Sequence, residues 1–287
     1  MIVIVGFVVV LGAVLAGFSM AGGQLAALVH PSEFVTIGGA ALGALILMSS
    51  KKVLTDVVLG LVQSVKGSPY NKLAYEELFK ALYDLLRLAR RDGLIVLESH
   101  ILNPEQSSIF YKYPKVAGNH HALQFICGAL APMVDGAVKA DQLRALMETE
   151  LKVLEEEHHA PVGVMAKTAD ALPGFGIVAA VMGIVVTMGA IDGPIAEVGE
   201  KVGAALVGTF LGVLLSYGFF GPLSVRMEMQ CAAEMNYFRT IAAVFEGFAQ
   251  DLPPKVAIEL ARRGVSSNMR PTRERLDDMF AEAEAAA

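Results

Sequence analysis

Four long stretches of the chain lack acidic and basic side chains and are rich in aliphatic residues. No Asp, Glu, Lys or Arg occurs in residues 1–32, 34–50, 171–191 or 202–225. Crossing a bilayer takes about 20 mostly apolar residues, and each stretch supplies about that number. A buried helix of a soluble domain can mimic one such stretch. Four of them, paired in twos by short turns, instead predict four membrane-spanning helices.

The remaining segments have the spacing of amphipathic helices. LAYEELFKALYDLLRLARRDG places leucines and aromatic residues three and four apart and ends at Gly93, and DQLRALMETELKVLEEEHH has the same character. LNPEQSSIFYKYPK carries two prolines and predicts a loop. After Pro222 the helical period continues the last span, LPPK ends it, and KVAIELARRG predicts a short helix. The final EAEAAA is expected to be a frayed tail.

These patterns predict an all-α integral membrane protein with four transmembrane helices and a large helical cytoplasmic domain. The expected parts are a first helix pair (1–50), a cytoplasmic helical domain (51–170), a second helix pair (171–225), and C-terminal cytoplasmic helices with a tail (226–287). Of the 23 Lys and Arg residues, 14 lie in 51–170, 8 follow Pro222, one is Lys201 and none precedes Lys51. The positive-inside rule then places the middle segment and both termini in the cytoplasm.

Composition agrees with a chain that is part membrane and part soluble. Mean hydropathy is +0.53, 54% of residues are hydrophobic, 18% are charged and the net charge is −6. The charges alternate in sign instead of forming basic stripes, which argues against nucleic-acid binding. Cys127 and Cys231 lack the spacing of a disulfide framework or a zinc site. The apolar N-terminus lacks a basic region and a good cleavage site, so we expect a retained span and no removable signal peptide.

The charge-free stretches offer no carboxylate and no lysine to bind an ion. Ionisable groups inside membranes are costly and are usually kept where an ion is relayed. If this chain moves ions, a partner is therefore expected to bring the acid. Adjacent residues such as Glu157, His158 and His159 point around a helix and do not converge on a metal. We expect no enzyme activity, no metal and no cofactor.

Small residues recur at every fourth position of the last charge-free stretch: Ala204, Gly208, Gly212 and Ser216. Such a face lets helix backbones approach closely in lipid and predicts contact with another subunit or a partner. Thr209 lies one residue off this stripe. Its hydroxyl is predicted to bond either a partner's carboxylate or water, or a carbonyl of its own helix, and both interpretations stay open.

Two prolines flank the second pair of spans. Pro173 is expected to open the third span and Pro222 to close the fourth. Either proline suits a helix boundary, and either leaves a free carbonyl and a hinge.

A cluster of both signs surrounds the Gly93 break, consisting of Arg87, Arg90, Arg91, Asp92 and Glu98. A solvated face and an electrostatic docking surface are both compatible with this cluster.

Four stretches, in this order, resemble the MotA family of flagellar motor stator subunits over nearly the whole chain. They are GGQLAALVHPSE, NPEQSSIFYKYP, LPGFGIVAAVMGIVVTMGAID and VGTFLGVLLSYGFFGPL. The resemblance implies a bacterial inner-membrane protein that couples inward proton flow to torque. It implies a MotB-like partner that carries the proton-binding aspartate, and a ring of five copies of this chain.

The resemblance also assigns roles to particular residues. Arg90 and Glu98 would engage the rotor switch protein FliG, Pro173 and Pro222 would take part in the working conformational change, and Thr209 and Ala180 would flank the ion path. Sodium-driven relatives carry a hydroxyl residue where this chain has Ala180. A dehydrated sodium ion needs several oxygen ligands, so alanine there favours protons.

Two other classes of protein are considered. ExbB and TolQ, proton-driven energisers of envelope transport, resemble a three-span version with different soluble parts, and the fourth span and the NPEQSSIFYKYP segment argue against them. A purely structural membrane scaffold would form a ring with no coupled ion movement.

Overall fold

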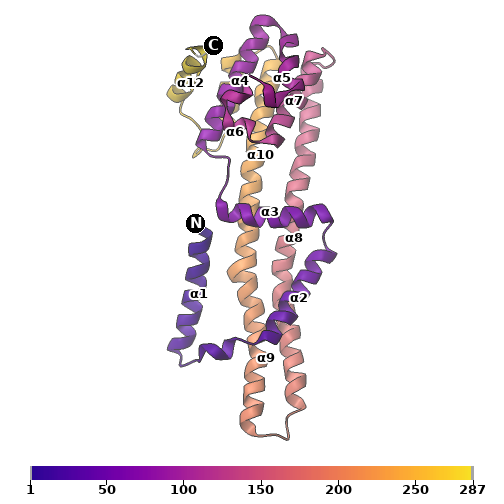
Figure 1. Ribbon diagram of the computed structural model, residues 1–287, viewed down its shortest axis with the longest axis vertical. Coiled ribbons are helices and arrows are strands. Elements are labelled where there is room, and N and C mark those ends of the chain that lie inside the picture. The colour runs from indigo at the N-terminus through magenta and orange to yellow at the C-terminus, as the bar shows by residue number, and fades with distance from the viewer. Residues whose placement is uncertain (1, 286–287) are drawn as a thin grey trace. The chain divides into compact units, whose positions relative to one another are not determined.

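The computed structural model describes residues 2–285, and the described chain is built from helices without strands (Figure 1). In chain order the elements are α1 (Ile2–Met20), η1 (Leu25–Leu28), α2 (Pro31–Leu47), α3 (Lys51–Lys66), α4 (Lys72–Asp92), η2 (Leu94–Leu97), α5 (Glu98–Leu102), η3 (Pro104–Gln106), η4 (Phe110–Lys112), α6 (Pro114–Ala117), α7 (His120–Val134), α8 (Ala140–Met188), α9 (Ile195–Leu215), the π-helix η5 (Ser216–Phe220), α10 (Gly221–Ala249), α11 (Pro254–Gly264) and α12 (Arg273–Ala285). The all-α prediction is confirmed for this part of the chain.

Four helical segments are long and apolar enough to cross a membrane. They are α1, the segment Leu25–Leu47, α8, and the continuous helix Ile195–Ala249 formed by α9, η5 and α10. Each contains one of the four charge-free stretches or most of it. The last two extend well beyond the apolar part, as expected for the segment after Pro222.

The chain divides into two compact units, the first comprising residues 1–67 and 157–230. In this unit the second part of α8 and α9 run side by side and are joined by a short turn (Figure 1). A small core of Ile37, Ala41, Leu172, Ala179 and Leu211 joins α2 to this pair. In this unit α8 and α9 therefore pack against each other, and α2 covers one side of the pair.

The helix α3 also belongs to the first unit and is amphipathic. Ser50 caps its N-terminus, because the hydroxyl accepts a hydrogen bond from Val53 N at 3.3 Å. Val57 is buried in a second small core with Val162, Met165 and Met227. Val58, Leu59, Val62 and Val65 leave a second apolar face of the helix exposed.

The second unit comprises residues 68–156 and 231–287 and has the larger core. The helix α4 lies at its centre, and Leu78, Phe79, Leu82, Leu85 and Leu86 are fully buried. These positions follow the three and four spacing predicted for this segment. Gly93 ends the helix with a φ of 89°, a conformation that glycine adopts without strain.

The NPEQSSIFYKYP segment forms short turns instead of a regular helix. It contains η3 and η4 and is anchored by Phe110, which is 1% exposed. Tyr113 donates its hydroxyl proton to Asp84 Oδ2 at 2.9 Å. Burial, reinforced by this bond to a carboxylate, raises the pKa of Tyr113 well above its ordinary value. The loop predicted here is therefore a packed and specifically bonded segment.

The prediction of a frayed C-terminal tail is wrong for residues 282–285. They belong to α12, which packs on α4 through Leu276, Met279, Phe280 and Ala283. The Phe280 ring lies 4.6 Å from that of Tyr83. Apolar residues three and four apart give this charged helix one narrow apolar face, and α4 covers it.

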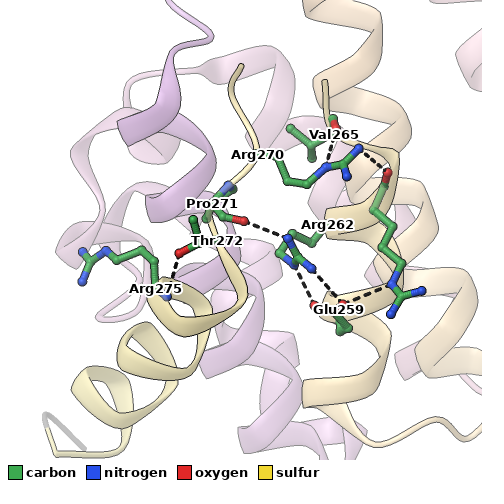
Figure 2. Close-up of polar contacts among 8 residues, drawn as sticks. Glu259, Arg262, Val265, Arg270, Pro271, Thr272 and Arg275 are labelled. Carbon is green, nitrogen blue, oxygen red and sulfur yellow. Dashed lines mark hydrogen bonds and ion pairs between the residues drawn. The ribbon is translucent and has the colours of Figure 1, made fainter. Parts of the chain in front are cut away.

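Figure 2 shows how arginines fix the connection between α11 and α12. Arg262 donates to Pro271 O at 2.8 Å and to both carboxylate oxygens of Glu259 at 2.7 and 2.9 Å. Arg270 donates to the carbonyls of Val265 and Arg263, each at 2.9 Å. Mainly through its bonds to Arg262, Glu259 has a pKa lowered to about 2.

We expect Glu259→Gln to loosen the α11 to α12 connection at neutral pH. A depressed pKa stabilises the fold above the unfolded value near 4.5, and this stability is lost as the pH falls through about 2. The substitution should therefore cost about 1–3 kcal/mol at pH 7. Amide hydrogen exchange of α12 would measure it. Equal protection of α12 in both proteins at pH 7 would contradict the expectation, and the exposed Glu274→Gln serves as control.

Candidate ion path and docking surface

The backbones of α8 and α9 approach each other where the small residues predict it. A Cβ atom added at Gly212 would lie 2.7 Å from Leu172 O and 2.8 Å from Gly176 Cα. A Cβ at Gly176 would lie 2.8 Å from Gly208 O. Real Cβ atoms do not come this close to backbone atoms, so these positions admit only glycine without a shift of the helices. In this chain the contact is therefore within one molecule.

The ends of the small-residue stripe lie in different surroundings. Ser216 is 1% exposed and begins the π-helix, whereas Ala204 is half-buried and lines a cavity beside η1. Next to the stripe, Ala205 meets Gly183 of α8, because a Cβ on that glycine would lie 2.7 Å from Ala205 Cβ. The predicted contact with another subunit or a partner stays a prediction.

Thr209 on α9 and Ala180 on α8 both adjoin the contact between these two helices. A Cβ at Gly208 would lie 3.2 Å from Ala180 N, and a Cβ at Gly176 would lie 3.3 Å from Thr209 Cα. Both residues are half-buried. The structure thus brings together two residues that are far apart in the sequence and were predicted to flank one path.

The hydroxyl of Thr209 makes no hydrogen bond within residues 2–285, unlike other helical threonines of the chain. Thr187 on α8, for example, donates to Gly183 O four residues earlier at 2.8 Å. Thr168 does the same to Val164 O at 2.9 Å. Of the two interpretations left open by the sequence, bonding to the carbonyl of its own helix is not what this structure shows for Thr209. The hydroxyl is available to an external partner.

Pro173 begins no helix, because it lies inside the uninterrupted helix α8, and its place at the start of the third span stays a prediction. A proline at this position cannot donate to the carbonyl four residues earlier, which leaves Ala169 O without its usual helical donor. The neighbouring Leu172 O faces Gly212 in the tight contact described above. Pro173 thus weakens α8 one residue from its closest approach to α9.

Pro222 follows directly on a π-helix. The five residues of η5 form wide turns, and Gly221 N donates to Ser216 O, five residues earlier. Such wide turns are uncommon and are often found at functional sites. The Phe219 ring of this segment lies 4.8 Å from that of Phe7 on α1. The helix continues through Pro222 as α10, so this proline marks an irregular turn and not a helix end.

Glu33 is a residue that the sequence reasoning missed. It lies in the one-residue gap between two charge-free stretches, and in the structure α2 begins at Pro31 and holds Glu33 in its first turn. It is 7% exposed. The helical segment Leu25–Leu47, which is long and apolar enough to cross a membrane, therefore holds a carboxylate just outside the charge-free stretches. Proline is favoured at the first position of a helix, and this preference was the signal that placed Glu33 inside it.

Arg90 and Glu98 lie on either side of the Gly93 break, and both are exposed. Arg90 makes a long ion pair with Asp251, 3.5 Å from Nη1 to Oδ1, and a 3.4 Å hydrogen bond to Asp251 O. It also lines a groove of about 540 Å³ together with Lys139. Loose pairing at an exposed position contributes little to stability, so the Arg90 charge is free to meet a partner.

We expect Gly212→Ala to lower the free energy of unfolding of the first unit by about 1–3 kcal/mol, since its Cβ would collide with backbone atoms of α8. Thermal unfolding of the purified protein would measure this. Gly174→Ala is the matched control, because a Cβ there meets no atom within 4 Å. The control should match the original protein or gain up to about 1 kcal/mol from the helix preference of alanine. Equal loss in both variants would contradict the close contact.

Comparison with known proteins agrees with this arrangement. The model of the motility protein A N-terminal region matches residues 4–93, and that of the MotA/TolQ/ExbB proton channel family matches residues 118–240. The chain is 36% identical to motility protein A of Salmonella typhimurium, over 95% of this chain and 92% of that protein. It is 38% identical to chemotaxis protein LafT of Vibrio parahaemolyticus, over 97% of this chain and 98% of that protein.

Solved structures show the same fold at lower sequence identity. The C. jejuni MotAB structure matches 94% of this chain and 98% of its own with a TM-score of 0.76 at 22% identity. The flagellar MotAB stator complex from Bacillus subtilis matches 96% of this chain and 98% of its own, with a TM-score of 0.73, also at 22% identity. With the sequence matches, they show that the chain belongs to the motility protein A family, the MotA-type stator subunits of the bacterial flagellar motor that act in a proton channel.

Proposed function

We propose that this chain is the A subunit of a proton-driven stator in the bacterial inner membrane. Five copies would form a ring around the membrane helices of a MotB-like partner, with both ends of each chain in the cytoplasm. Both solved structures named above are MotAB structures, which supports a MotB-like partner. Ring formation requires contacts between different faces of neighbouring copies, which close only at a fixed number of subunits.

The observation that carries this proposal is the unbonded hydroxyl of Thr209 beside Ala180. In a helix surrounded by lipid, a free hydroxyl gains most from a polar partner that another subunit supplies. The aspartate of a MotB-like partner is such a group. Ala180 has no oxygen in its side chain, which suits a site for protons better than one for dehydrated sodium ions.

In the proposed cycle, a proton from outside neutralises the partner's aspartate and weakens its contact near Thr209. The ring then steps, and the proton leaves to the cytoplasm. One elementary charge crossing the membrane is worth about 2.3 kcal/mol per 100 mV. That energy is enough to bias one step between two conformations that differ in helix packing at Pro173 and η5. The proposed cycle requires no covalent catalysis and no cofactor.

Torque would reach the rotor through Arg90 and Glu98. Both charges are exposed in the second unit, Arg90 in the last turn of α4 and Glu98 at the start of α5. An exposed pair of opposite signs suits a rotor surface with matching charges, because such contacts are fast to form and to break. We assign that surface to the rotor switch protein FliG.

Thr209→Ala is expected to slow rotation and to change its dependence on external pH, because the hydroxyl near the partner's aspartate is lost. Thr209→Ser keeps the hydroxyl and should restore much of the speed. Thr187→Ala is the matched control, since that hydroxyl is already bonded to its own helix. Tethered-cell rotation across external pH measures all three variants. Unchanged speed of Thr209→Ala at every pH would make Thr209 a packing residue.

Reversing both docking charges, with Arg90→Glu and Glu98→Lys in one chain, is expected to abolish swimming while the stator still assembles with its partner. The reason is repulsion at the rotor surface, since neither charge is buried. Motility in soft agar and co-purification with the B subunit measure the two effects. Lys152→Glu, an exposed charge on α8, is the control and should swim normally. Normal swimming of the double variant would remove the docking assignment.

The function itself is tested by joint reconstitution. Vesicles that hold this chain together with its MotB-like partner should take up protons under a membrane potential, and vesicles with a sodium gradient alone should not accumulate sodium. Absence of proton uptake by the joint complex would overturn the proposal.

A further inference from the structure

Glu33 is the most unusual side chain of the first unit. It lies in the first turn of α2 and is 7% exposed, and its Oε2 is fully buried with no hydrogen-bond partner in residues 2–285. A buried carboxylate oxygen without a partner is costly, by several kcal/mol in an apolar environment. Packing alone does not explain it, because a leucine would fill the same space without this cost.

The carboxyl is seated in a notch that only glycine provides. A Cβ added at Gly208 would lie 2.6 Å from Glu33 Oε2, so the absence of a side chain at that position is what makes room for the acid. The same added Cβ would lie 3.1 Å from Ala179 Cβ and 3.2 Å from Ala180 N of α8. The acid therefore reaches the junction where α2, α8 and α9 come together, next to Thr209.

An open cavity of about 840 Å³ lies beside this junction. It is bounded by η1, the approach to α2 and one side of α9, and His30 and Val207 line it. His30 lies three positions before Glu33, and Val207 lies one position before Gly208. The cavity therefore comes close to the notch along the sequence of both helices. The Nδ1 atom of His30 is buried and, in residues 2–285, unpartnered as well. Water in this cavity would meet the polar side chains of Gln24, His30 and Glu200.

Within residues 2–285 no basic side chain forms an ion pair with the acid. The titratable side chains that line the neighbouring cavity are His30 and Glu200. Lys201 is occupied by an ion pair with Glu197 at 2.9 Å. The part of α8 that packs here, residues 171–188, holds no titratable group, and neither do α1 and the rest of α2.

We propose that Glu33 is a proton-transfer group at the entrance of the ion path. Water in the cavity delivers a proton: an O–H bond of a hydronium ion breaks, and an O–H bond forms on the Glu33 carboxylate. That bond then breaks in turn, and the proton passes by water to the carboxylate of the partner's aspartate near Thr209, which returns Glu33 to its charged form. This inference rests on the proposed function, because it adds a step before the partner's acid.

The test is proton uptake by vesicles that hold this chain with its MotB-like partner, measured against external pH. Glu33→Gln keeps the size and shape of the side chain and removes only the exchangeable carboxyl proton. We expect uptake to fall by about tenfold or more, with a changed pH profile. Glu33→Asp should keep part of the flux. Glu197→Gln, an exposed carboxylate of α9 in the same unit, is the matched control and should behave like the original protein.

A second measurement reads protonation without transport. The infrared carbonyl band of a neutral carboxyl group should appear in the original protein as the pH falls, and the difference spectrum against Glu33→Gln should assign it to this residue. If Glu33→Gln does not assemble, Glu33→Asp provides the reference, and the band should then shift in position.

The possible results separate the two claims. No uptake by the original complex would overturn the proposed function. Normal uptake by the original complex, matched by Glu33→Gln at every pH, would overturn only the inference about Glu33. The inference would also fail if the carbonyl band did not change with pH.

Discussion

The approach of two backbones at Gly176, Gly208 and Gly212 is the constraint on which the membrane part of this protein depends. Lipid offers no hydrophobic drive for helices to associate, so close van der Waals contact between α8 and α9 has to hold them together. Glycines supply that contact, because a Cβ added at Gly176 or Gly212 would lie within 3 Å of a backbone atom of the opposing helix, and one at Gly208 would lie 3.2 Å from Ala180 N. The same absence of side chains opens the notch for Glu33 and exposes one face of α9 near Thr209.

This arrangement ties the chemistry to the packing. Leu172 O faces Gly212, and Pro173 stands next to it without a backbone N–H group to donate. A change in the bend of α8 at Pro173 therefore alters the same contact that positions Ala180 against Gly208. Small residues in this family member serve the interior of one subunit first, and any contact with other subunits has to use the faces that remain.

Much of the fold could be predicted from the pattern of apolar residues. The four charge-free stretches, the helical spacing around Leu78 and Leu82 and the stop at Gly93 all depend on local physics that a sequence displays directly. The prediction of a frayed tail was wrong because the apolar face of α12 consists of only four residues, and the helix that covers it, α4, lies about 200 positions earlier. Such a pairing has no local signature.

The site was predictable in part. The stripe that includes Gly208 and Gly212 was visible in the sequence, but which helix it meets was not, since periodicity gives a face and not a neighbour. Glu33 was missed because it lies outside the charge-free stretches, and the sequence analysis did not use Pro31 as the start of a helix two residues earlier. The bonding state of Thr209 depends on a side-chain rotamer, which no sequence pattern specifies.

The π-helix Ser216–Phe220 has a geometric consequence for the rod formed by α9 and α10. A π turn holds one residue more than an α turn, which offsets the side chains after it by about 100° around the axis. Residues of α9 and α10 that would share one face of a regular helix therefore lie on different faces. One continuous helix can thus present its lipid-facing side chains in one direction along α9 and a different face in that direction along α10.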